Sequence, residues 1–174
     1  TLPTLLQDAG YNTYMAGKWH LGDRPQSQPV ARGFTRSFAL MESGADNWEA
    51  KHYLPGGSAT WIEDGKPVDL PEGFYSSFTY ADKLIDYIDS GRTDGKPFFG
   101  YLAFQAVHAP HQVPEDYIQR YADIYDQGWD AIRQQRYQRQ LASGLLPDTG
   151  ENAVTDDWGT FYARRHIDWA SLSD

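Results

Sequence analysis

The stretch GYNTYMAGKWHLG, residues 10–22, decides how this chain folds and what it presents to a ligand. Residues 11–16 predict a short strand, and Gly17 and Gly22 after it permit backbone conformations or close approaches that a side chain would block. Ligands of open α/β sheets bind at the carboxyl ends of strands, so Lys18 and His20 are candidate binding residues. The alternative is an ordinary strand exit with a surface lysine and an incidental histidine.

A second strand followed by a histidine-bearing loop lies in the middle of the chain. Residues 97–104 form a continuous apolar and aromatic run, which predicts a central strand buried on both faces. The loop after it carries His108 and His111 among prolines. Both histidines could be turn residues. The pair is also a metal-site candidate, although no Asp, Glu or Cys stands nearby at ligand spacing.

Composition limits the classes of protein to which the chain can belong. Its 174 residues are 40% hydrophobic and 15% aromatic, which is enough for one globular domain or a piece of one. A formal net charge of −9 argues against a nucleic-acid binder or a protein that binds anionic membranes. No run approaches the roughly 20 apolar residues of a membrane span, so the sequence predicts a soluble protein in a compartment that it does not identify. The absence of cysteine excludes disulfides and thiolate metal sites.

Helical and strand patterns elsewhere predict an α/β fold. Apolar residues recur at helical spacing over residues 2–9 and 79–91, and residues 37–40 predict a short strand. Residues 42–73 lack a sustained period and are interpreted as a loop-rich insertion, with a hairpin around Asp64-Gly65. Residues 115–146 predict a helical segment. Its first part carries a stripe that we expect in the core, formed by Tyr117, Ile118, Tyr121, Ile124 and Tyr125.

Residues 10–22 resemble the second signature of the type I, formylglycine-dependent sulfatases, Gly-Tyr-x-Thr-x-x-x-Gly-Lys-Trp-His-Leu-Gly. The resemblance continues through residues 31–34, 70–77 and 97–110, and it is strongest to the bacterial arylsulfatases. It implies a segment of an α/β, alkaline-phosphatase-like sandwich with a mostly parallel sheet flanked by helices. Residues 1–174 would then form part of a sulfatase catalytic domain.

The resemblance assigns catalytic roles to three side chains. Lys18 matches the family lysine that holds sulfate and formylglycine, and His20 matches the histidine beside the formylglycine hydroxyl. His108 matches the histidine near the sulfate and the leaving oxygen, whereas His111 falls on a position that is usually apolar. Lys18 and His108 are therefore the substrate-binding candidates. We expect Lys18, His20 and His108 to converge at the carboxyl ends of adjacent strands, away from the other histidines, His52, His111 and His166.

Several parts of the family's active site have no counterpart in this sequence. No residue stands in the Cys/Ser-x-Pro/Ala-x-Arg motif that yields formylglycine. Calcium is expected in full-length members, held by an early acidic pair and a later Asp-Asn pair, and no metal ligand is assigned here because neither pair occurs at a matching position. Asp156 and Asp157 are not assigned to calcium. We therefore expect an internal fragment that is inactive toward sulfate esters when isolated.

The expected function is sulfuric ester hydrolysis of the arylsulfatase type, with a small-molecule sulfate ester as substrate. One alternative is a phosphonate or phosphodiester monoester hydrolase of the same superfamily, which shares a Gly-Lys-x-His loop and the nucleophile type. Trp19-His20-Leu21-Gly22 favours the sulfatase. Another alternative is a noncatalytic anion-binding module. The sequence leaves the oligomeric state open.

Overall fold

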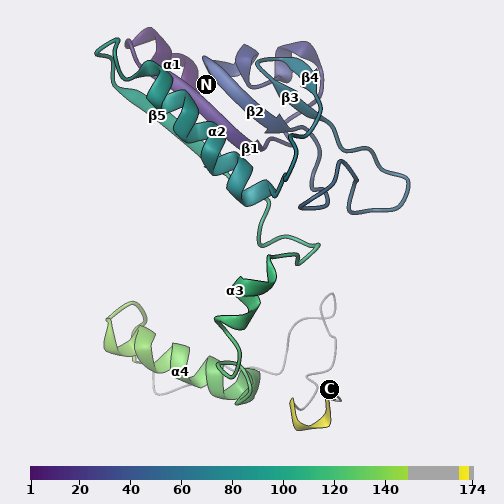
Figure 1. Cartoon of the computed structure of the whole chain (residues 1–174). Coiled ribbons are helices and arrows are strands. Elements are labelled where there is room, and N and C mark those ends of the chain that lie inside the picture. Colours follow the sequence, from purple (N-terminus) through teal and green to yellow (C-terminus); the bar gives the residue numbers. More distant parts are fainter. Residues whose placement is uncertain (149–168, 173–174) are drawn as a thin grey trace. The chain divides into compact units, whose positions relative to one another are not determined.

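The computed structural model of the chain describes residues 1–148 and 169–172. These residues belong to two compact units, Thr1–Val113 and Pro114–Asp174, and each unit is described by itself. The first unit contains the sheet with helices α1 (Leu2–Asp8) and α2 (Ser76–Gly91) (Figure 1). Within the described part of the chain, no helix combines the length and apolar character that crossing a membrane requires.

The first unit is built on a five-stranded mixed sheet of order β4-β3-β2-β1-β5. Its strands are β1 (Asn12–Lys18), β2 (Arg36–Leu40), β3 (Trp61–Glu63), β4 (Lys66–Val68) and β5 (Phe98–Ala103). β1 pairs in parallel with both β2 and β5, whereas β3 pairs antiparallel with β2 and β4. The expected α/β sheet with flanking helices is confirmed. The hairpin expected at Asp64-Gly65 adds its two antiparallel strands.

Alternating side chains of the central strands form two cores, one on each face of the sheet. On one face Tyr14 and Phe38 pack with residues of α2, and Figure 1 shows this helix lying along the sheet. On the other face Met15 and Ala39 pack with Trp19 and Phe34. The apolar periodicity at residues 79–91 therefore reports the face of α2 that covers the sheet.

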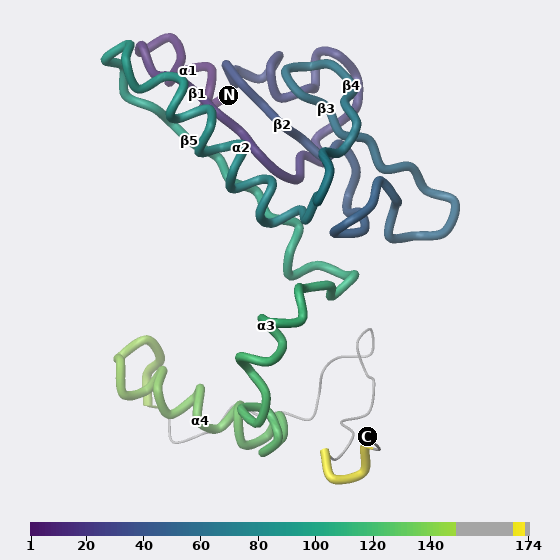
Figure 2. Tube along the Cα trace, viewed as in Figure 1, coloured from purple at the N-terminus to yellow at the C-terminus, as the bar shows by residue number. Residues whose placement is uncertain are grey.

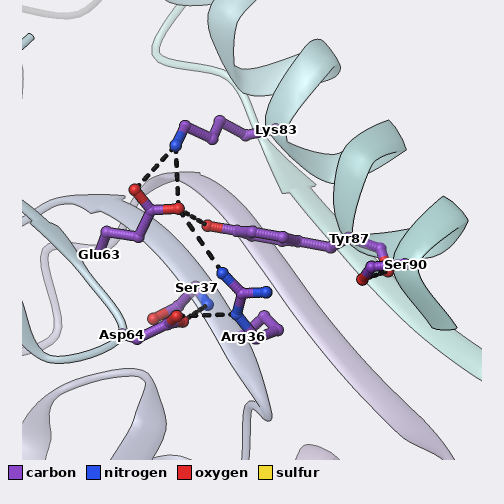
Figure 3. A network of polar contacts seen from close by, with 7 residues as sticks. All are labelled: Arg36, Ser37, Glu63, Asp64, Lys83, Tyr87 and Ser90. Atoms are coloured by element: carbon purple, nitrogen blue, oxygen red, sulfur yellow. Dashed lines mark hydrogen bonds and ion pairs between the residues drawn. The ribbon is translucent and has the colours of Figure 1, made fainter. Parts of the chain in front are cut away.

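A polar network near the start of β2 joins α2 to the β3–β4 hairpin (Figure 3). The carboxylate of Glu63 accepts hydrogen bonds from Lys83 Nζ at 2.7 and 2.9 Å and from the Tyr87 hydroxyl at 2.7 Å. Arg36 donates to Asp64 at 2.7 Å and lies over the ring of Tyr87. Burial alone would raise the pKa of Glu63, but the bonds from Lys83 and Tyr87 outweigh it and lower that pKa.

The prediction that residues 97–104 form a central strand buried on both faces is wrong. β5 is an edge strand of the described sheet, and Phe98 and Tyr101 are 52% and 46% exposed. A continuous apolar run shows that both faces of a strand favour burial, but it does not report the number of neighbouring strands. Among the described residues no strand pairs with the outer side of β5.

The second unit contains helices α3 (Glu115–Gln119) and α4 (Gly128–Ala142) and a short 3-10 turn, Trp169–Ser171. The expected helical segment is present, but its aromatic stripe is not a core. α3 ends at Gln119, so the helical spacing on which the stripe depends is interrupted. Four members of the stripe are about half exposed, namely Ile118, Tyr121, Ile124 and Tyr125.

Candidate functional site

The carboxyl end of β1 is held close to β5 by a glycine. Gly17 lies opposite Ala103 in the parallel register and has a φ of 122°. A Cβ atom at this position would collide with the Ala103 carbonyl oxygen, so only glycine permits this approach. Buried Trp19 fixes the chain beyond the strand, because its backbone N–H donates to Leu40 and its indole N–H donates to Ser27, both at 2.8 Å.

Lys18 and His20 flank this anchored tryptophan and are both available to a ligand. Lys18 is half-buried at the last position of β1, and His20 is exposed with a φ of 51°. Within the described ranges neither side chain makes a hydrogen bond or an ion pair. The strand end therefore presents one fixed positive charge and one titratable ring without a protein partner.

His108 is held by its own loop and by a tyrosine from a distant segment. Its backbone N–H donates to Gln105 at 2.9 Å, and its Nδ1 lies 2.8 Å from the carbonyl oxygen of Ala109. A carbonyl oxygen can only accept, so Nδ1 carries a proton and Nε2 is the atom left for a ligand. The ring of Tyr53 meets the His108 ring edge-on, with 5.2 Å between centroids.

The topology brings the two candidate loops to the same edge of the sheet. β1 and β5 are parallel neighbours, Lys18 ends β1, and the His108 loop follows the end of β5. No contact between Lys18, His20 and His108 is recorded in the described structure, so their convergence stays a prediction. His111 is exposed, and His166 lies outside the described residues. His52 packs on Tyr53 with 4.7 Å between ring centroids, and Tyr53 in turn contacts His108.

A buried amide, Asn47, ties three segments together beside the His108 loop. Its Oδ1 accepts from Gln105 Nε2 at 2.7 Å and from the Ser76 hydroxyl at 2.5 Å. Its Nδ2 lies within hydrogen-bond distance of the Pro110 carbonyl and of Gln112 Oε1, at 3.3 and 3.4 Å. Asn47, Ser76 and Gln105 are all at most 5% exposed. The loop that bears His108 is therefore clamped on both sides of the histidine.

Asp46 extends this clamp to the far end of the His108 loop. Its carboxylate accepts from Gln112 Nε2 at 2.6 Å and from the backbone N–H groups of Trp48 and Glu49. Burial alone would raise the pKa of Asp46, but these hydrogen bonds outweigh it and hold that pKa below its usual value. Asp46 is thus a charged anchor of the loop.

Sequence reasoning did not find Asn47 or Tyr53. Both lie in residues 42–60, where no periodic pattern exists to indicate which side chains turn inward. Gln105 did carry a signal, since it is the polar residue at which the apolar run stops. Its Oε1 is buried without a hydrogen-bond partner in the described part of the chain.

The described residues do not supply a metal centre. Residues 1–148 and 169–172 contain no group of three or more His, Asp or Glu side chains that could hold an ion. Calcium prefers six to eight oxygen ligands, and Asp46, which anchors the His108 loop, has its carboxylate engaged by hydrogen bonds. These side chains do not fit a calcium site.

Comparison with known proteins gives one consistent family. A family model described as Sulfatase matches residues 1–154. The chain is 40% identical over 170 residues to an uncharacterized sulfatase of Schizosaccharomyces pombe, covering 91% of this chain and 30% of that protein. It is 39% identical over 153 residues to an arylsulfatase of Klebsiella aerogenes, covering 85% of this chain and 32% of that protein. The chain therefore spans about a third of the length of these curated relatives.

Solved structures agree with this result. Ps i-CgsB in complex with k-i-k-neocarrahexaose superimposes with a TM-score of 0.60 at 28% identity, over 71% of this chain and 30% of that one. BT4656 in complex with its substrate, D-glucosamine-2-N,6-O-disulfate, gives a TM-score of 0.51 at 29% identity, over 70% of this chain and 21% of that one.

Proposed function

Because this chain belongs to the sulfatase family, we propose that it supplies a lysine and two histidines to the active site of a sulfuric ester hydrolase. One observation carries the proposal. Lys18 is a half-buried cation without a partner in the described ranges, and it ends a strand parallel to the one that leads into the His108 loop. In a chain of net charge −9, such a cation favours the binding of an anionic group at this one edge. Residues 1–174 then form part of the catalytic domain.

Each of the three side chains has a role that suits its chemistry. The Lys18 ammonium is a compact charge with three donors, which suits the nonbridging oxygens of a sulfate. The imidazole of His20 can take a proton from a hydroxyl beside it. For His108, the Ala109 carbonyl oxygen holds Nδ1–H, so a proton destined for the leaving oxygen is carried on Nε2.

Two groups must come from outside the described residues. Formylglycine supplies the attacking oxygen in this family. Calcium, which sulfatases generally require, needs oxygen ligands that the described side chains do not form. Neither the binding of sulfate by Lys18 nor the proton transfer by His108 depends on a calcium ligand from these residues.

The relatives favour a small sulfate ester as substrate. The Klebsiella relative is an arylsulfatase, and a relative from Canis lupus familiaris, 34% identical, is an N-acetylgalactosamine-6-sulfatase. BT4656 was solved with a disulfated glucosamine. We extend this substrate class, a sulfated aryl or sugar alcohol, to the complete protein.

The test compares sulfate with phosphonate esters in the full-length gene product. We expect kcat/KM for 4-nitrophenyl sulfate to exceed that for 4-nitrophenyl phenylphosphonate by at least about tenfold. The reverse order would instead assign a phosphonate or phosphodiester monoester hydrolase. Binding of inorganic sulfate without turnover of either ester would assign a noncatalytic anion-binding module.

A further inference from the structure

We propose that the hollow formed by residues 50–59 binds the alcohol part of the sulfate ester, and that Lys51 there recognises a second anionic group on a ring alcohol. This inference rests on the proposed function, because it takes His108 as the group beside the leaving oxygen. It assigns the segment between β2 and β3 to substrate specificity.

The segment between β2 and β3 contacts His108 directly. Tyr53 contacts the His108 ring edge-on, with ring planes at 81°, and its hydroxyl lies 3.3 Å from the Ser43 hydroxyl. The hydrogen bonds of Asn47 to Pro110 and Gln112 join the same segment to the His108 loop. If His108 lies beside the leaving oxygen, the alcohol part of the ester therefore lies close to Tyr53.

Tyr53 also forms part of the wall of a hollow. Residues 50–59 line a cavity of about 440 Å³, within the range of small-molecule sites. Figure 2 shows the chain between β2 and β3 running well away from the sheet as a long loop. None of residues 50–58 belongs to either core, so packing of the sheet does not explain their arrangement.

The shape of the hollow depends on a glycine and a histidine in contact. A Cβ atom at Gly57 would collide with the His52 ring, so this side of the hollow tolerates no side chain at position 57. The Leu54 N–H donates to His52 Nδ1 at 3.0 Å. The same Nδ1 lies 3.2 Å from the Leu54 carbonyl oxygen, so the backbone of Leu54 holds this nitrogen and Nε2 is the ring atom left for a ligand.

The charge of the hollow indicates what it binds. Lys51 is exposed and forms no ion pair within the described part of the chain. Asp46 interacts with it electrostatically but beyond ion-pair distance, and the Asp46 carboxylate is already engaged by Gln112. An unpaired cation beside a tyrosine, a histidine and two glycines suits a ring with a carboxylate or a second sulfate better than a plain hydrocarbon.

The experiment measures KM and kcat of the full-length gene product on matched substrates. The neutral ring is 4-nitrophenyl sulfate, and the anionic rings are 4-carboxyphenyl sulfate and D-glucosamine-2-N,6-O-disulfate. We expect Lys51→Gln to raise KM for an anionic ring about tenfold, with less than about twofold change for the neutral ring and little change in kcat. Lys96→Gln, in an exposed loop, is the matched control and leaves all constants unchanged.

The two anionic substrates show whether the second anionic group is recognised on an aryl ring or on a sugar ring. An equal KM shift for neutral and anionic rings, or no shift, would overturn the role of Lys51. Tyr53→Ala raises KM for every ring substrate if the hollow holds the alcohol, and unchanged KM values would overturn that assignment.

A binding measurement separates this inference from the proposed function. If the wild-type protein hydrolyses neither ester, the proposed function fails, and the hollow is tested by titrating the 174-residue chain with 4-hydroxybenzoate. We expect NMR shifts of the His52 ring that Lys51→Gln abolishes and Lys96→Gln preserves. Absence of these shifts in the wild-type chain would overturn the hollow as a binding site.

Discussion

Lys18 owes its position to the residues on either side of it. Gly17 lets the backbone of β5 approach, and the buried indole of Trp19 fixes the chain beyond the strand, so the ammonium is presented from a rigid support. Preorganised charge of this kind stabilises charge that develops in a transition state.

Replacing Lys18 should therefore abolish most activity without unfolding the protein. In the full-length gene product we expect Lys18→Ala to lower kcat for 4-nitrophenyl sulfate by about 10²- to 10³-fold, because fixed donors are worth that much in comparable sites. Lys66→Ala, an exposed lysine on β4, is the control and should leave kcat unchanged. Equal losses in both variants would show that Lys18 has no special role.

The two histidines of the second loop should behave oppositely. His108→Ala should lower kcat by about 10²-fold or more, because it removes the group proposed to donate a proton to the leaving oxygen. His111→Leu should leave kcat nearly unchanged, since His111 is exposed and an apolar residue is the commoner type at this position of the family. Steady-state kinetics on one aryl sulfate decides between them, and a silent His108→Ala with an inactive His111→Leu would reverse the assignment.

The sequence named candidate site residues only where a motif included them, and their roles stay predictions. Lys18, His20 and His108 were assigned because the residues around them match a family motif. The pairing of β1 with β5 places the two matching stretches on adjacent strands. Asn47 and Tyr53 were not predictable, because their partners, Gln105 and His108, are distant in sequence and no periodicity links them.

Asn47 acts at the scale of elements, because it joins the loop after β2 to the start of α2 and to the loop after β5. Asn47→Ala leaves the buried donors of Gln105 and Ser76 without an acceptor. We expect this variant of the 174-residue chain to lose about 2 to 4 kcal/mol of unfolding free energy, measured by urea denaturation. Gln26→Ala, an exposed amide, should change it by less than about 0.5 kcal/mol. A similar small loss for Asn47→Ala would contradict the clamp.

Glu63 fastens α2 to the β3–β4 hairpin in a pH-dependent way. Its pKa is lowered in the folded state, so its contribution to stability is present above its unfolded pKa of about 4.3 and is lost as the pH falls through the folded value. Glu63→Gln should cost about 1 to 2 kcal/mol at pH 7 and should flatten the decline of stability on acidification.

Urea denaturation at pH values between about 3 and 7 measures this effect. Glu72→Gln, at an exposed glutamate without a described hydrogen bond, is the control and should keep the wild-type pH dependence. Parallel curves for wild type and Glu63→Gln would show that the Lys83 and Tyr87 bonds contribute nothing to acid sensitivity.

Local sequence patterns predicted the helices and strands of the first unit well, but they did not predict which side chains are buried. The spacing of residues 79–91 and the turn at Asp64-Gly65 are local properties, and both elements formed as predicted. Burial of β5 depends on neighbours outside the run itself, and the burial of Tyr121 and Tyr125 depended on a helix that ends at Gln119. Patterns within one element cannot report such neighbours.

For the whole molecule, the α/β, alkaline-phosphatase-like expectation is confirmed by the mixed sheet and by the superposition on solved relatives at a TM-score of 0.60. The sheet is less parallel than expected, because β3 pairs antiparallel with both β2 and β4. The hairpin was visible in the sequence, but its pairing with β2 was not.

The 174-residue chain by itself should not hydrolyse an aryl sulfate. Its sequence contains no cysteine and no serine in the formylglycine motif, so it lacks the precursor of the attacking oxygen. Incubation of the purified chain with 4-nitrophenyl sulfate, with and without calcium, measures this directly. Turnover above that of a Lys18→Ala chain would reveal a nucleophile within these residues.

The position of β1 between β2 and β5 also sets the order in which this sheet can form. β1 and β2 lie close together in the sequence, whereas Asn12 pairs with Phe98 across the β3–β4 hairpin and α2. Closing so long a loop lowers the chain entropy before the β1–β5 contacts stabilise the sheet, which slows folding. At any stage of folding at which β5 is not yet available, the strand that carries Lys18 therefore lacks its partner on one side.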